Sequence, residues 1–134
     1  MAEYTIKNLK SDVEDQAPKF GFSPDLEARF ARQTLELERS GVSYQKLAPG
    51  FRIPFGPTHG KQEEVYVIVS GGGRAKLGEE IVDVKAWDAV RVGSDVWRAF
   101  EAGPEGMEFI AFGARCGMGV EDSDADMEQG WWSD

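Results

Sequence analysis

A short stretch in the middle of the chain holds the side chains best suited to acid–base chemistry. It contains His59, the only histidine of the sequence, and the glutamates Glu63 and Glu64, and a run rich in valine follows directly. An imidazole and a carboxylate that lie close together can act as general acid and general base. Nucleophilic catalysis is not indicated, because no serine stands at a recognisable triad spacing from His59.

Length, charge and cysteine content narrow the class of protein. The 134 residues predict a single domain over residues 1–134. The net charge of −9 argues against nucleic-acid binding, because phosphate recognition needs a basic face. There is no apolar run of the roughly 20 residues that a membrane helix needs, and no early apolar stretch typical of a signal peptide. Cys116 is the only cysteine, so an intrachain disulfide is excluded and we expect a cytoplasmic protein.

The central stretch also contains the clearest strand of the sequence, at residues 64–70. Three valines, an isoleucine and a tyrosine favour β-structure there. Because side chains alternate along a strand, Glu64, Tyr66 and Ile68 are predicted to face the interior, and the three valines that alternate with them to face the other way. The glycines 71–73 then predict a hairpin turn.

Other apolar runs, separated by glycine-rich segments, predict further short strands. These strands cover residues 41–48, 74–77, 81–84, 88–92, 96–101 and 107–112. Turns are expected at residues 93–95 and 103–106, and the prolines and glycine of residues 54–57 predict an irregular segment or a sheet edge. Several short strands of this kind predict an all-β sandwich or barrel.

The two ends of the chain are less regular. Residues 4–9 are consistent with a short edge strand and residues 11–19 with a loop. Residues 26–39 fit two structures: Ser23 and Pro24 favour the start of a helix, whereas alternation favours a strand. Residues 121–134 carry six acidic residues, no basic residue and a tryptophan pair. This tail is either solvated or anchored by its tryptophans on the barrel or on a second subunit.

The spacing around His59 resembles the first motif of the cupin family, G-x5-H-x-H-x(3,4)-E-x6-G. His59 is followed by four residues, Glu64, six residues and Gly71. Residues 87–102 resemble the second motif, G-x5-P-x-G-x2-H-x3-N, in outline only. The resemblance implies a cupin-type antiparallel β-barrel, jelly-roll-like, at about residues 42–113, with an irregular N-terminal arm at 1–41 and an acidic C-terminal tail. It also implies a pocket in the barrel mouth and a homodimer, which would cover the apolar valine face.

The metal positions of the family are only partly matched. Cupins that bind metal use two histidines and the glutamate of the first motif, and a histidine of the second. Here those positions hold Pro57, His59, Glu64 and Arg98. A guanidinium has no lone pair to donate to a metal and would repel a divalent ion. We therefore predict no metal cofactor, and a divalent transition metal is the alternative.

The substitutions suggest a different polar site in the same place. Arg98 would lie near Glu64, where a bidentate guanidinium–carboxylate pair can replace a metal–carboxylate bond. His59 would join them through a hydrogen bond, and Tyr66 and Phe100 complete the predicted ligand-binding residues. Alternatively, these side chains only complete a polar network inside the barrel.

Two classes of function are consistent with such a site. The first is a metal-free cupin-fold protein that binds a small polar or carboxylate metabolite in the barrel mouth. The second is an enzyme, either an isomerase or lyase that uses His59 and Glu64 as acid and base, or a metal-dependent dioxygenase. A purely structural role is the third possibility. The sequence does not identify the ligand.

Overall fold

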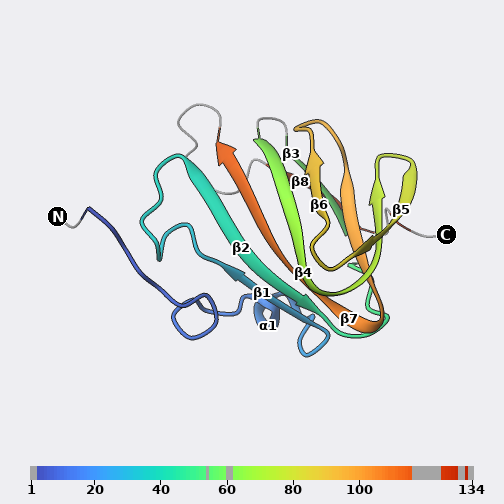
Figure 1. Ribbon diagram of the computed structural model, residues 1–134, viewed down its shortest axis with the longest axis horizontal. Helices are drawn as coiled ribbons and strands as arrows, with labels where there is room; N and C mark the ends of the chain where they lie inside the picture. Colours follow the sequence, from blue (N-terminus) through green and yellow to red (C-terminus); the bar gives the residue numbers. More distant parts are fainter. Residues whose placement is uncertain (1–2, 54, 60–61, 116–124, 130–131, 133–134) are drawn as a thin grey trace.

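Antiparallel strands form nearly all of the regular structure in the computed structural model, which describes residues 3–53, 55–59, 62–115, 125–129 and 132 (Figure 1). Only the backbone is described at residues 55–59, 62, 114–115 and 125–129. The elements are α1 (Ala17–Phe20), β1 (Leu26–Phe30), β2 (Ser40–Leu47), β3 (Phe55–His59), β4 (Gln62–Leu77), β5 (Glu80–Lys85), β6 (Ala89–Val92), β7 (Arg98–Arg115) and β8 (Ala125–Gln129). This content confirms the all-β prediction. No helix among the described residues has the length and apolar character needed to cross a membrane.

The strands form two sheets with antiparallel pairing throughout. The larger sheet has six strands in the order β1-β2-β7-β4-β5, and β6 pairs with β4 beside that path. The smaller sheet pairs β3 with β8. Within the described part of the chain β8 is the only strand partner of β3, which confirms that residues 54–57 lead into a sheet edge.

The long strands β4 and β7 bend together, and the bend folds the large sheet into two facing layers (Figure 1). The turns predicted at residues 71–73 and 103–106 are wrong, because each strand continues through its glycines with shifts in pairing register. A Cβ atom on Gly73 would lie 2.0 Å from the carbonyl oxygen of Glu101. Glycine is therefore needed here so that two backbones can approach closely, and not for a reversal of the chain.

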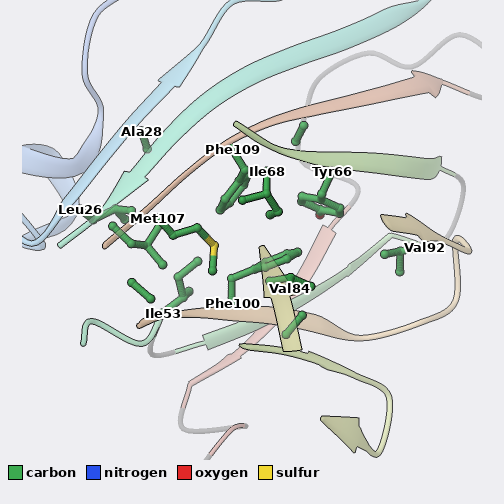
Figure 2. Close-up of a cluster of buried hydrophobic side chains, with 14 of the residues drawn as sticks. Leu26, Ala28, Ile53, Tyr66, Ile68, Val84, Val92, Phe100, Met107 and Phe109 are labelled. Carbon is green, nitrogen blue, oxygen red and sulfur yellow. The ribbon is translucent and has the colours of Figure 1, made fainter. Parts of the chain in front are cut away.

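The central strand β4 presents the faces that its alternation predicts. Tyr66 and Ile68 are buried, whereas the alternating valines of β4 are only partly buried on the opposite face. Figure 2 shows the apolar cluster that Tyr66 and Ile68 join, between the two layers. Its larger members are Leu26, Leu47, Ile53, Tyr66, Ile68, Val84, Val92, Phe100, Met107 and Phe109. Burial of these side chains is the main driving force that holds the layers together.

The N-terminal part of the chain departs from two of the predictions. Residues 4–9 form no strand, and residues 11–19 run into the short helix α1 instead of remaining a loop. At residues 26–39 the strand alternative is confirmed for β1, which pairs with β2. The helix signal fails because β1 gains a full ladder of hydrogen bonds and buries Leu26 and Ala28 in the core.

The C-terminal segment is anchored on the barrel. β8 pairs with β3, and Trp132 is buried. The guanidinium carbon of Arg52 lies 4.5 Å from the centre of the Trp132 ring, and that of Arg74 lies 5.5 Å from it. Both arginines also bond to the carboxylate of Glu101. The solvated-tail interpretation is therefore wrong for this segment, and anchoring on the barrel is observed. Residues 121–124 and Trp131 lie outside the described residues.

Candidate functional site

The bend of β4 and β7 brings together two charged residues that lie far apart in sequence and in the sheet ladder. Glu64 is near the start of β4, where it pairs with Gly113 of β7 and Val92 of β6. Arg98 is the first residue of β7 and pairs with Leu77 at the far end of β4. Because the two halves of each strand face each other, Nη1 of Arg98 reaches Oε1 of Glu64 at 2.9 Å.

Arg98 is held inside the protein by hydrogen bonds that leave its guanidinium little contact with solvent. Its side chain is 1% exposed, whereas that of Glu64 is 15% exposed. Nε donates to the carbonyl oxygen of Val96 at 2.9 Å, and Nη2 donates to the carbonyl oxygens of Val96 and Gly93 at 2.6 and 2.8 Å. Arg98 therefore ties the β6–β7 loop to Glu64. The contact with Glu64 uses one nitrogen, so the bidentate geometry that the sequence suggested is wrong.

Tyr66 donates a second hydrogen bond to the same carboxylate oxygen. Its hydroxyl lies 2.5 Å from Oε1 of Glu64. Burial raises the pKa of Tyr66, and the negative charge of Glu64 raises it further. The phenol thus remains a proton donor to the carboxylate at neutral pH. A buried cation and a buried hydroxyl together fix the position of Glu64.

Aromatic rings fill the space next to this polar group. The ring centre of Tyr66 is 4.8 Å from that of Phe100 and 5.6 Å from that of Phe109, and the two phenylalanine rings are 4.9 Å apart. Figure 2 shows these three rings together in the core. Phe100 is thus a core residue that supports Tyr66. The sequence analysis did not single out Phe109, although its alternation with Ala111 on a predicted strand was a signal for an inward position.

The structure brings together four of the five predicted site residues. Glu64, Tyr66 and Arg98 share hydrogen bonds, and Phe100 packs against Tyr66. His59 lies on β3, opposite Ala125 of β8, and its side chain lies outside what the structure describes. Within the described part of the chain, histidine, cysteine and acidic side chains form no group of three or more that could hold a metal ion.

A separate cavity lies outside the barrel, beneath the N-terminal arm. It has a volume of about 420 Å³ and is lined by Lys7, Asn8, Leu9, Lys10, Tyr44, Val69, Glu108 and Ile110. The hydroxyl of Tyr44 donates to Glu108 at 2.5 Å, and this hydrogen bond lowers the pKa of Glu108. Lys10 lies 5.1 Å from the Tyr44 ring centre and 3.7 Å from Glu108. These contacts attach the arm to the sheet, and the sequence did not indicate them.

Comparison with known proteins finds similarity at the level of structure. No protein-family model matches the sequence, and no curated protein does. A cupin protein from Bacteroides fragilis superposes with a TM-score of 0.70 at 22% identity, covering 92% of this chain and 93% of that chain. A predicted oxalate decarboxylase from Thermotoga maritima superposes with a TM-score of 0.60 at 22% identity, covering 68% of this chain and 81% of that chain.

A larger enzyme contains the same fold as one part of its chain. A mutant of Bacillus subtilis oxalate decarboxylase superposes with a TM-score of 0.69 at 21% identity. The match covers 90% of this chain and 32% of that enzyme, so this chain spans about a third of its length. Together with the antiparallel strand order and the His59–Glu64–Gly71 spacing, these similarities show that the chain has the cupin fold.

Proposed function

We propose that this chain binds a small polar molecule next to Glu64, in the mouth of the barrel, without a metal. The observation that carries the proposal is the position of Glu64: its carboxylate is oriented by Arg98 and Tyr66 and still keeps some contact with solvent. A charged group that is held in place and partly open to solvent can bind a ligand without first being ordered.

The residues at the family's metal positions do not fit a divalent ion. The Arg98 guanidinium lies 2.9 Å from the Glu64 carboxylate, in the place of the ligand histidine. It cannot coordinate a metal, and its charge opposes a second cation beside the same carboxylate. The backbone at the first histidine position belongs to Pro57 on β3, and proline offers no ligand atom on its side chain.

A metal-dependent enzyme is the second candidate, and the names of the similar structures favour it. Two of them are called oxalate decarboxylases. Metal analysis of the purified chain separates the two candidates. The metal-free proposal predicts far less than one transition metal per chain and a melting temperature that a chelator does not change. One tightly held metal per chain would favour the enzyme.

A ligand screen tests the binding proposal itself. Small polar metabolites are added to the protein, and a true ligand raises the melting temperature in proportion to its concentration through mass action. The Glu64→Gln variant should lose this shift. The Glu63→Gln variant is the matched control, because Glu63 is the adjacent, exposed glutamate that pairs with Arg91. An equal response of both variants would contradict binding at Glu64.

A further inference from the structure

The chemical class of the ligand can be inferred from the hydrogen bonds already made inside the site. Arg98 is the cation that would attract a carboxylate ligand. It donates four hydrogen bonds to Glu64, Val96 and Gly93, and its side chain is 1% exposed. To bind an anion, Arg98 would have to give up a buried partner, which would leave that partner without its hydrogen bond. The guanidinium is therefore part of the support of the site and not a group that meets ligand.

The hydroxyl of Tyr66 is similarly committed. Its proton is donated to Oε1 of Glu64 at 2.5 Å, and the residue is buried. A phenol has one proton, so Tyr66 cannot donate to a ligand while it holds Glu64. Both donors of the group thus point at the carboxylate from within the protein.

Glu64 is the charged member of the group that keeps contact with solvent. An ionised carboxylate accepts hydrogen bonds at about four lone-pair positions and donates none. Arg98 and Tyr66 both use Oε1. A ligand that approaches this end of the group therefore meets negative oxygen first, with the compensating cation behind it.

Resting on the binding site proposed above, we propose that this site selects a ligand that donates hydrogen bonds to Glu64, an ammonium or hydroxyl compound, and rejects carboxylates. A carboxylate would place its charge beside that of Glu64, and like charges in contact are unfavourable in a partly buried site. The net charge of −9 acts in the same direction, because it raises the local concentration of cations and lowers that of anions.

Three probes with the same carbon skeleton test the ligand class: n-propylammonium, 1-propanol and propionate. Each is titrated into isotope-labelled protein, and chemical-shift changes are followed for the amides of Glu64 and Tyr66 and for the Nε–H of Arg98. We expect saturable shifts with n-propylammonium, weaker shifts with 1-propanol and none with propionate. In Glu64→Gln the affinity for n-propylammonium should fall by about tenfold or more, because a charged hydrogen bond becomes neutral. Glu63→Gln controls for general attraction of cations to an acidic protein and should bind as the parent does.

The outcomes separate the inference from the proposed function. Saturable binding of propionate at these amides, with affinity equal to or above that of n-propylammonium, would overturn the ligand class and leave a binding site in place. Equal losses in the two glutamine variants would also overturn it. If none of the probes shifts these signals at any concentration, the proposed binding function fails. Because the probe comparison uses the parent protein, it remains decisive even if Glu64→Gln does not fold.

Discussion

Arg98 and Glu64 form an ion pair in which the arginine is the more deeply buried partner, at 1% exposure against 15%. This asymmetry predicts a large effect of Arg98→Ala on the free energy of unfolding, about 3–5 kcal/mol lower than in the parent. The change would leave the Glu64 charge and the carbonyls of Gly93 and Val96 without their donor. Urea unfolding monitored by circular dichroism measures the difference.

The ion pair of Arg91 with Glu63 provides the matched control for this measurement. Its N–O distance is also 2.9 Å, but both side chains are mostly exposed. Arg91→Ala should therefore cost less than about 1 kcal/mol. If Arg98→Ala were no more destabilising than Arg91→Ala, the hydrogen bonds of Arg98 would contribute little to the fold.

Restoring the family's histidines should create metal affinity. The double change Pro57→His with Arg98→His provides three imidazoles and one carboxylate at the family's ligand spacing, a set that suits nickel, iron or zinc. We expect this variant to melt below the parent without metal, because the Arg98 hydrogen bonds are lost, and to gain stability as metal is added. Pro57→His alone retains the cation and should show no such gain. A metal-induced rise of equal size in both variants would show that Arg98 does not oppose metal binding.

Tyr66 should make the fold sensitive to alkaline pH. Burial, followed by the charge of Glu64, raises its pKa in the folded state, whereas an unfolded tyrosine ionises near about pH 10. Above that pH the unfolded chain loses a proton that the folded chain keeps, so stability is complete below about pH 10 and falls as pH rises further. Tyr66→Phe removes this contribution. Its unfolding free energy should decline less steeply above about pH 10 than that of the parent, whereas the exposed Tyr4→Phe control should follow the parent.

Trp132 should hold the C-terminal segment and, through β8, the strand that carries His59. Trp132 is 5% exposed, and its carbonyl accepts a hydrogen bond from Nη1 of Arg52 at 3.1 Å. We expect Trp132→Ala to release β8, so that backbone amides of β3 exchange hydrogen faster. The stability cost should approach the roughly 3–5 kcal/mol of a buried tryptophan if the segment unfolds with the barrel. Trp87→Ala is the control, because Trp87 is 75% exposed. Unchanged β3 exchange in Trp132→Ala would show that Trp132 does not position this strand.

We also expect the chain to form a homodimer through the outer face of the large sheet. Val65 lies opposite Phe112, and Val67 lies opposite Ile110, so these side chains form one apolar surface. Phe112 is 50% exposed, and Phe30, on the other face of the sheet, is 47% exposed. Phe112→Asp should therefore shift sedimentation toward the monomer, whereas Phe30→Asp should not. Sedimentation of the parent as a monomer at micromolar concentration would contradict the dimer.

The parts of the site that could be predicted from sequence depend on local pattern. Alternation along residues 64–70 predicted that Tyr66 and Ile68 face inward, and both are buried. Resemblance to the cupin motifs placed Arg98 beside Glu64, and the two are in contact. These predictions succeeded because strand periodicity and motif spacing survive in the fold whatever the rest of the chain does.

Tertiary structure decided what the glycines do and where the tail goes. Glycine permits both a tight turn and a close approach of two strands, and only the pairing of β4 with β7 made residues 71–73 part of a bend. The acidic C-terminal segment has few features of a strand, yet β8 pairs with β3 more than 60 positions earlier. The number of hydrogen bonds on Arg98, and hence the ligand class, likewise depends on the β6–β7 loop. Such long-range contacts leave no local pattern in the sequence, because the partners meet only when the two layers close.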